Sequence, residues 1–223
     1  DLSKPPTLIQ LAVEAAYKLA LKNTRGIFFQ NPDDASFFEQ KKLIPPNCKT
    51  IEVVAGSGVN TRVYKHETLK RQLVFFMAGR LLIKKGTKLF LDAALEIKNN
   101  HPDVKFKIAG WSDGAADSVS IEEINKLHPT GVVDLLGHLN AVSDAMRSCS
   151  VFVLPTIYNE GTPRSILEAL STGRAVITTD MPGCRETVID GYNGYLIQPN
   201  SLGSLITAIE AFIKQPHDIV KFG

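Results

Sequence analysis

The sequence predicts an α/β fold with a Rossmann-like, doubly wound parallel sheet. Short apolar runs bounded by turn residues, such as Val151–Leu154, have the pattern of strands buried on both faces. Segments with helical periodicity alternate with these runs along the chain. The 223 residues are 44% apolar and 22% charged, which is typical of a folded globular chain with one large domain or two small ones.

The first part of the chain predicts a helix, a strand and a second helix. Residues 7–23 have an apolar face rich in alanine, which favours a core-packing helix over a helix on a membrane surface, although lysines lie nearby. A short strand is expected at residues 26–30. Asn31 then caps a helix that begins at Pro32, and the two aspartates that follow fit its first turn without a metal ion.

A glycine-rich turn follows the strand expected at residues 51–55. Residues 56–60 read G-S-G-V-N, like the start of a dinucleotide-binding motif, but Thr61 replaces the third glycine and no clear helix follows. We therefore interpret this segment as a structural turn in which Gly58 or Asn60 adopts a positive φ.

Basic residues follow a continuous apolar run at residues 73–78, which predicts a central strand. Arg80 and Lys85 come after the carboxyl end of this strand, where Arg80 can bind a phosphate bidentately and Lys85 can act as a point charge. Taken alone, the segment favours a solvated basic loop. An amphipathic helix is expected at residues 86–100.

The middle of the chain continues the alternation. Trp111 lies in the loop after a predicted strand, where it could cover a nucleobase or pack against the sheet edge. The expected elements are a strand at residues 104–109, a helix at 121–127, a strand at 132–136 and a helix at 141–148.

A loop and a helix start follow the strand at Val151–Leu154. Thr162 is the predicted N-cap and Pro163 the first helical residue. The helix runs to about Thr172, and Gly173 stands where a left-handed C-cap belongs. The last expected elements are strands at residues 175–178 and 195–197 and a helix at 202–214.

Two glutamates mark this segment as a candidate site. Glu160 precedes Gly161 in the loop, and Glu168 lies on the second turn of the helix. The first turn carries Arg164 and Ser165 but no acid, so its free N–H groups are available to an external anion such as phosphate. Spacing alone leaves an ordinary helix start, with Glu168 solvated, equally open.

A family resemblance rests on the full run of motifs. Glu160 and Glu168, followed by residues 170–173, 182–186 and 190–194, resemble the EX7E region of retaining glycosyltransferases with the GT-B fold. The sequence is most similar to glycosyltransferase family 4, in the group 1 C-terminal domain of bacterial members that build capsule, O-antigen or lipid-linked oligosaccharides. The glutamate pair alone is a weak signal, whereas the full run is specific.

The resemblance implies a role for each candidate residue. Arg80 and Lys85 match a G-R-L-x3-K-G pattern that holds the donor diphosphate, and Glu168 accepts the ribose hydroxyls. Glu160 holds donor-sugar hydroxyls and helps to orient the sugar for front-face attack with retention. Backbone groups at Leu139 read the nucleobase. The implied donor-binding set also includes Gly161, Thr162, Pro163, Arg164 and Ser165.

The same resemblance implies the domains and the reaction. Residues 49–223 match the donor half, before its last crossover helix, and residues 1–48 match the tail of an N-terminal acceptor domain. The expected reaction moves a hexose or N-acetylhexosamine from a UDP-sugar to a glycan or a polyprenyl-diphosphate-linked acceptor, and the fragment alone is expected to be inactive or weak. A sugar-nucleotide epimerase and a non-catalytic nucleotide-binding module remain as alternatives.

Composition limits the other function classes. A net charge of +2 gives no support to nucleic-acid binding, and no apolar run reaches the length of a membrane span. Three scattered cysteines favour a reduced, cytoplasmic setting, and the resemblance leaves open a peripheral contact of the full-length protein with the inner face of the cell membrane. No D-x-D cluster occurs and the histidines are dispersed, so neither a metal ion nor another cofactor is expected.

Overall fold

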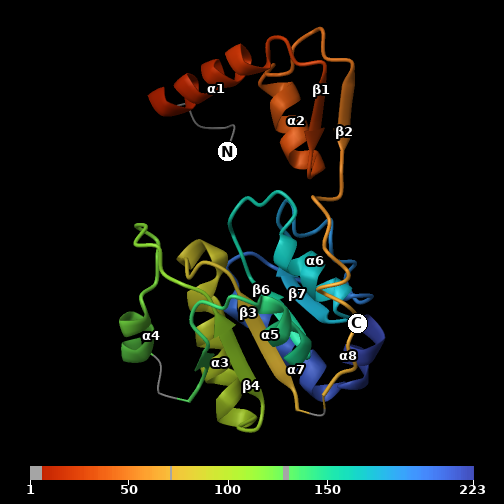
Figure 1. Ribbon diagram of the computed structural model, residues 1–223. Helices are drawn as coiled ribbons and strands as arrows, with labels where there is room; N and C mark the ends of the chain where they lie inside the picture. Colours follow the sequence, from red (N-terminus) through yellow and green to blue (C-terminus); the bar gives the residue numbers. More distant parts are fainter. Residues whose placement is uncertain (1–6, 71, 128–130) are drawn as a thin grey trace. The chain divides into compact units, whose positions relative to one another are not determined.

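The computed structural model describes residues 7–70, 72–127 and 131–223 (Figure 1). The chain divides into two compact units, Asp1–Gly56 and Ser57–Gly223. The sequence placed the boundary between residues 48 and 49. The difference arises because the strand after residue 49 pairs with a strand of the first unit and so belongs to it.

The smaller unit holds two helices and a two-stranded parallel sheet. Thr7 and Gln10 form a capping box at the start of the first helix, and Asn31 caps the second by accepting a 2.7 Å hydrogen bond from the Asp34 amide. Its elements are α1 (Leu8–Leu21), β1 (Gly26–Phe29), α2 (Pro32–Gln40) and β2 (Thr50–Val53).

The apolar face of α1 is less buried than the sequence predicted. Tyr17 packs edge-to-face on Phe38 of α2, with ring centroids 5.1 Å apart, but Leu8 and Ile9 stay 86% and 77% exposed. The helix forms as predicted, because its caps and periodicity are local signals. Its expected packing into a core is wrong for most of its apolar residues.

A six-stranded parallel sheet forms the centre of the larger unit, with the strand order β5-β4-β3-β6-β7-β8. Counted in chain order within this unit, the order is 3-2-1-4-5-6, that of a dinucleotide-binding Rossmann sheet. It reverses direction between β3 and β6, and ligands bind at the carboxyl ends of the strands beside such a reversal. The strands are β3 (Val74–Ala78), β4 (Lys105–Ala109), β5 (Asp134–Leu135), β6 (Val151–Leu154), β7 (Ala175–Thr179) and β8 (Gly194–Ile197).

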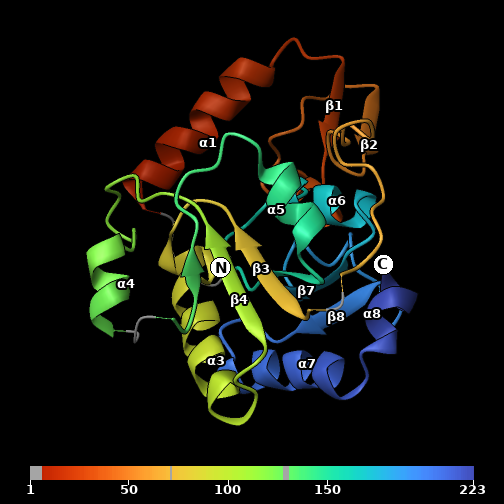
Figure 2. The same ribbon diagram turned by 60° about the horizontal axis from the view of Figure 1, so that its bottom comes forward.

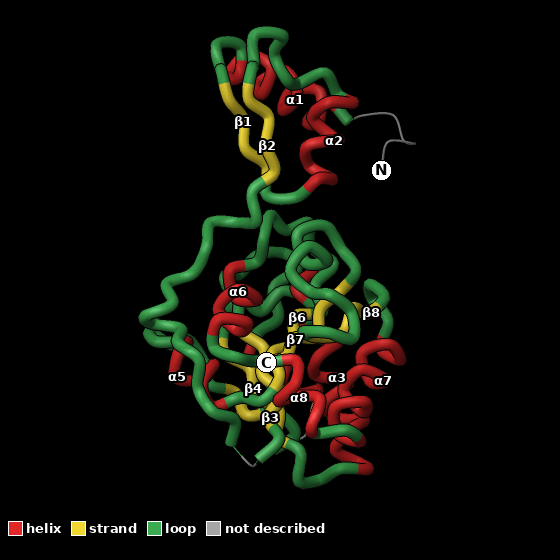
Figure 3. Tube along the Cα trace, turned by 90° about the vertical axis from the view of Figure 1, so that its right-hand side faces the viewer, coloured by secondary structure: helices red, strands yellow, loops and turns green. Residues whose placement is uncertain are grey.

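Helices cover both faces of this sheet (Figures 2 and 3). Alternate residues of β3 serve the two cores: Phe75 and Met77 join the core under α3, α7 and α8, and Phe76 joins the core under α5 and α6. The sheet is therefore doubly wound, as predicted. The helices are α3 (Thr87–Asn100), α4 (Ile121–Leu127), α5 (Val142–Ser148), α6 (Arg164–Ser171), α7 (Leu202–Lys214) and α8 (His217–Phe222), with a 3-10 turn, η1 (Ile83–Lys85), before α3.

Most element boundaries agree with the sequence prediction to within a few residues. The strand expected at residues 132–136 is limited to Asp134–Leu135, and α8 was not predicted. Gly58 and Gly173 adopt the positive φ expected of them, 75° and 74°, whereas Asn60 does not. Within the ranges that the structure describes, no helix combines the length and apolarity needed to cross a bilayer.

Candidate functional site

Three glycines form the base of the site at the carboxyl ends of adjacent strands. Gly79 follows β3, Gly110 follows β4 and Gly137 follows β5. A Cβ atom on Gly110 would lie 1.9 Å from the carbonyl oxygen of Gly79, and the Gly110 amide donates a 2.9 Å hydrogen bond to the Gly137 carbonyl. The loop after β4 therefore packs on the loop after β3 more closely than a side chain at position 110 would allow, and a backbone hydrogen bond joins it to the loop after β5.

A cavity of about 170 Å³ opens above this base. One wall comes from the loops after β4 and β5, where Trp111 packs edge-to-face on His138 with ring centroids 5.0 Å apart. The other wall comes from α6. The lining residues are Ala78, Gly79, Ala109, Gly110, Trp111, His138, Leu139, Val142, Ser165 and Glu168.

Lys85 and Glu160 form an ion pair although 75 residues separate them in the sequence. Their side chains are only 18% and 15% exposed. The backbone explains the meeting, because the Ile157 amide donates a 2.7 Å hydrogen bond to the Lys84 carbonyl. Gly86, with φ of 83°, fits against the end of β6, where an added Cβ would lie 2.3 Å from the Pro155 carbonyl oxygen.

A second close glycine contact supports the loop that carries Glu160. A Cβ on Gly183, whose φ is 83°, would lie 1.7 Å from the Gly161 carbonyl oxygen. The next residue, Cys184, is completely buried, and burial raises the pKa of its thiol to about 11. The turn after β7 therefore packs directly on the backbone of Glu160 and Gly161 and determines the position of that loop.

Glu168 faces the cavity from the second turn of α6, with 13% of its side chain exposed. Burial raises the pKa of its carboxyl group, and a hydrogen bond from Tyr64 and the charge of Arg164 oppose that rise. Tyr64 lies in a segment bound along α6, where Ser171 Oγ donates a hydrogen bond to the Tyr64 carbonyl. The cavity is thus lined by a carboxylate that is held in place and largely shielded from water.

The start of α6 differs by one residue from the prediction. Pro163, not Thr162, is the N-cap, and the helix begins at Arg164. The ψ of Pro163 is 114°, outside the helical range, and Thr162 precedes this cap with 8% of its surface exposed. The Ile166 amide is the first to bond to the Pro163 carbonyl, so the amides of Arg164 and Ser165 precede the helical ladder and favour an anion.

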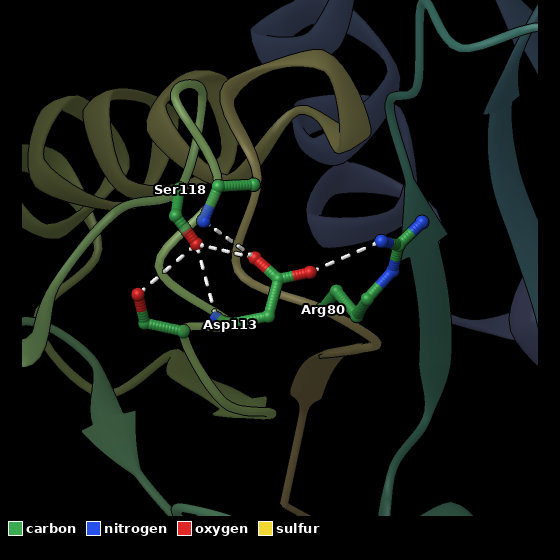
Figure 4. A network of polar contacts seen from close by, with 5 residues as sticks. Arg80, Asp113 and Ser118 are labelled. Atoms are coloured by element: carbon green, nitrogen blue, oxygen red, sulfur yellow. Dashed lines mark hydrogen bonds and ion pairs between the residues drawn. The ribbon is translucent and has the colours of Figure 1, made fainter.

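Arg80 lies between the loops that follow the two neighbours of β3 (Figure 4). Its Nη1 is 3.1 Å from Oδ2 of Asp113, and 43% of the Arg80 side chain is exposed. The hydrogen bond to Asp113 raises the pKa of the guanidinium, with a smaller contribution from Tyr158. The Nζ of Lys85 lies 5.7 Å from the centroid of the Tyr158 ring, so one tyrosine adjoins both cations.

The structure brings the predicted site residues to one edge of the sheet. Lys85 and Glu160 are in contact, and Leu139, Ser165 and Glu168 line the same cavity. Arg80 does not line that cavity, but its neighbour Gly79 does. Around the start of α6, Gly161 and Arg164 are exposed, whereas Thr162 and Pro163 are buried.

Sequence reasoning missed three side chains at this edge. His138 is exposed at the surface and also lines the cavity, just after a predicted strand. Tyr64 contacts Glu168, and Asp113 and Tyr158 contact Arg80. No local sequence pattern predicts these contacts. Among the described residues, no group of three or more His, Cys, Asp or Glu side chains could hold a metal ion.

Two curated relatives cover most of this chain. It is 34% identical over 202 residues to the UDP-Gal:alpha-D-GlcNAc-diphosphoundecaprenol alpha-1,3-galactosyltransferase of Escherichia coli, which is 83% of this chain and 50% of that protein. It is 27% identical over 201 residues to the N,N'-diacetylbacillosaminyl-diphospho-undecaprenol alpha-1,3-N-acetylgalactosaminyltransferase of Campylobacter jejuni, again 50% of that protein and 84% of this chain. The chain thus spans about half the length of these relatives.

Solved structures share the fold. Anabaena Alr3699/HepE in complex with UDP-glucose superposes with a TM-score of 0.81 at 21% identity, covering 100% of this chain and 63% of that one. The family model for glycosyl transferases group 1 matches residues 60–223, which include the whole six-stranded sheet and every predicted site residue. The chain therefore belongs to the glycosyl transferases group 1, and its larger unit is the Rossmann-like C-terminal domain of a GT-B fold.

Proposed function

We propose that the larger unit binds the nucleoside-diphosphate-sugar donor of a retaining glycosyltransferase, with UDP as the nucleotide. The main support is that the Lys85–Glu160 pair, Glu168 and the start of α6 lie on the same edge of the sheet, beside the point where the strand order reverses. This edge combines donors for a diphosphate, a carboxylate for hydroxyl groups and a cavity with one aromatic wall.

Each part of the donor has a matching group in this arrangement. Arg80, Lys85 and the first amides of α6 take the diphosphate, and their positive charge does so in this proposal without a metal ion or other cofactor. The Glu168 carboxylate accepts the ribose hydroxyls at the cavity wall. The base enters between α6 and the wall formed by Trp111 and His138, with the Leu139 backbone at its edge.

The proposed reaction exchanges two bonds at the anomeric carbon of the donor sugar, a hexose or an N-acetylhexosamine. The bond to the leaving phosphate oxygen breaks, the acceptor oxygen attacks from the same face, and the acceptor proton passes to the departing phosphate. Negative charge grows on the diphosphate as the bond breaks, so Arg80, Lys85 and the α6 amides stabilise the transition state more than the bound donor.

Glu160 orients the sugar in this scheme and is not its nucleophile. Its carboxylate is paired with Lys85, and a double-displacement mechanism requires two carboxylates on either side of the reacting carbon. An ion-paired carboxylate can still accept hydrogen bonds from sugar hydroxyls. The pair therefore links the group that holds the sugar to the cation that holds its phosphate.

The acceptor is proposed from the two curated relatives, whose names specify undecaprenol-diphosphate-linked sugars. We infer that the full-length protein extends a glycan on a polyprenyl-diphosphate carrier, with the acceptor bound by a domain outside residues 57–223. Such a carrier lies in a membrane, so a cytoplasmic enzyme would act as a peripheral protein on the inner face.

Calorimetric titration with UDP, UDP-sugars and GDP-sugars tests donor binding. UDP should bind the wild-type chain, and Glu168→Ala should weaken that binding by about 1–3 kcal/mol because charge-assisted hydrogen bonds to the ribose are lost. Glu96→Ala, on the exposed side of α3, is the matched control and should bind as the wild type does. Absence of UDP binding by the wild type, or an unchanged affinity in Glu168→Ala, would contradict the proposal.

A further inference from the structure

Asp113 forms an ion pair with Arg80, yet the proposed function gives it no task. The two residues come from the loops after β4 and β3, which are neighbours in the sheet. Oδ2 of Asp113 accepts a hydrogen bond from Nη1 of Arg80 at 3.1 Å (Figure 4). A carboxylate beside a cation that is meant for phosphate either positions that cation or competes with the phosphate.

The backbone fixes the Asp113 loop to the chain that follows Arg80. The Leu81 amide donates to the Trp111 carbonyl at 3.0 Å, and the Val119 amide donates to the Leu81 carbonyl at 2.7 Å. Leu81 and Val119 are 2% and 5% exposed, so this short ladder is anchored in the core. Asp113 therefore has a defined location relative to Arg80 although both side chains are partly exposed.

The Asp113 carboxylate is itself held from within its loop. Its Oδ1 accepts hydrogen bonds from the Ala115 amide at 3.1 Å and from Ser118 Oγ at 2.9 Å. The Ser118 hydroxyl in turn accepts from Ser112 Oγ at 3.0 Å and from the Asp113 amide at 3.2 Å, as Figure 4 shows. The Ala115 amide, Ser118 and Arg80 lower the pKa of Asp113, in that order, so the carboxylate stays ionised.

The geometry of the contact is compatible with phosphate binding. The bond to Asp113 uses Nη1, and a guanidinium carries five N–H donors, so Arg80 can keep this bond while other donors face a diphosphate. An exposed arginine otherwise samples many rotamers, and ordering it costs side-chain entropy. Asp113 reduces that cost before the ligand arrives, which favours positioning over competition.

We propose that Asp113, anchored by Ser118, is a positioning residue that holds Arg80 in the orientation in which it binds the donor diphosphate. The inference rests on the proposed function, because it needs a nucleoside diphosphate at this edge. It adds to that function a residue that never touches the donor and acts only through Arg80.

The test is a double-mutant cycle on UDP affinity, measured by calorimetry on the whole chain. Asp113→Asn should weaken UDP binding about fivefold, the scale of an exposed ion pair, and should have no effect in an Arg80→Ala background. Uridine, which lacks phosphates, should bind wild type and Asp113→Asn equally. Ser118→Ala should weaken UDP binding by a smaller factor, because it loosens the anchor but keeps the carboxylate.

The matched control is Asp117→Asn, which removes the same charge from the same loop and should leave UDP binding unchanged. Tighter UDP binding by Asp113→Asn would overturn the inference in favour of a competing anion. Equal weakening in wild-type and Arg80→Ala backgrounds would also overturn it, since Asp113 would then not act through Arg80. A wild-type chain that binds UDP but is insensitive to Asp113→Asn refutes this inference alone, whereas a wild-type chain that does not bind UDP refutes the proposed function with it.

Discussion

The two cations of the candidate site are held in different ways. The Lys85–Glu160 pair is 18% and 15% exposed and lies where two glycines, Gly86 and Gly183, allow backbones to pack closely. The Arg80–Asp113 pair is 43% and 26% exposed and depends on hydroxyl and amide donors within one loop. The Lys85–Glu160 pair is thus mostly buried between closely packed backbone segments, whereas the Arg80–Asp113 pair lies at the surface.

This difference predicts opposite consequences of mutation. Loss of a partner in the shielded pair leaves a poorly solvated charge and should affect folding as well as binding. Loss of a partner in the exposed pair leaves a solvated charge, so only the orientation of the remaining side chain should change. Four experiments can break or sharpen the contrast.

The largest effect is expected from Gly183→Ala. The new Cβ would lie 1.7 Å from the Gly161 carbonyl oxygen at a φ of 83°, so the loop that carries Glu160 must move. We expect a loss of at least about 3 kcal/mol in the free energy of unfolding, measured by denaturant titration. The control is Gly203→Ala in α7, which meets nothing within 4 Å and should stabilise by about 0.5–1 kcal/mol. Equal stability of the two variants would show that the loop yields easily.

Lys85→Met should have the next largest effect. It leaves Glu160 without its cation at a site where water cannot fully replace it, and we expect about 3 kcal/mol of destabilisation in the same assay. The double variant Lys85→Met with Glu160→Gln should recover part of that loss. Arg80→Met is the counterpart on the exposed side and should change stability by less than about 0.5 kcal/mol. Similar losses in the two single variants would remove the distinction between the pairs.

The smallest effect concerns protonation. Burial raises the pKa of Glu168, whereas the Ala115 amide and Ser118 lower the pKa of Asp113, so carbon-detected NMR titration should find the two carboxyl groups on opposite sides of their usual values. A raised folded-state pKa means that the native protein binds the Glu168 proton more tightly than the unfolded chain does. This contribution to stability therefore falls as pH rises from the ordinary glutamate pKa through the raised value.

Glu168→Gln removes that dependence. The variant should gain stability relative to the wild type at neutral pH and lose the gain as the pH falls towards the ordinary glutamate pKa, while binding UDP less well. Thermal unfolding at a series of pH values measures the difference. A pH-independent difference between the two proteins would show that Glu168 does not titrate with a raised pKa.

Local signals in the sequence predicted the sheet. Continuous apolar runs marked β3, β6 and β7, whereas the convergence of the charged residues after β3 and β6 on one site was implied only by the family resemblance. The error at the start of α6 was a single residue, since Thr162 has the right chemistry for a cap but the extended backbone of Pro163 occupies the N-cap position.

The remaining features depend on distant parts of the chain. Tyr64 reaches Glu168, and Asp113 reaches Arg80, only because the sheet has formed and the connecting segments pack against it. The close packing of Gly183 on Gly161 has the same origin. A glycine at a turn predicts a positive φ, but it does not predict which distant backbone segment will pack against it. The pattern of a single sequence segment cannot predict such contacts between distant residues.

The burial of Cys184 makes this cysteine an intrinsic probe for opening of the loop that carries Glu160. The thiol lies under the Glu160 loop with a pKa of about 11, so an alkylating reagent at neutral pH meets a thiol that is both covered and almost entirely protonated. Modification of this cysteine requires the cover to lift. Its labelling rate, followed by mass spectrometry of the peptide that contains it, would therefore report how often the Glu160 loop opens. A ligand that bridges Lys85 and the start of α6 should lower that rate.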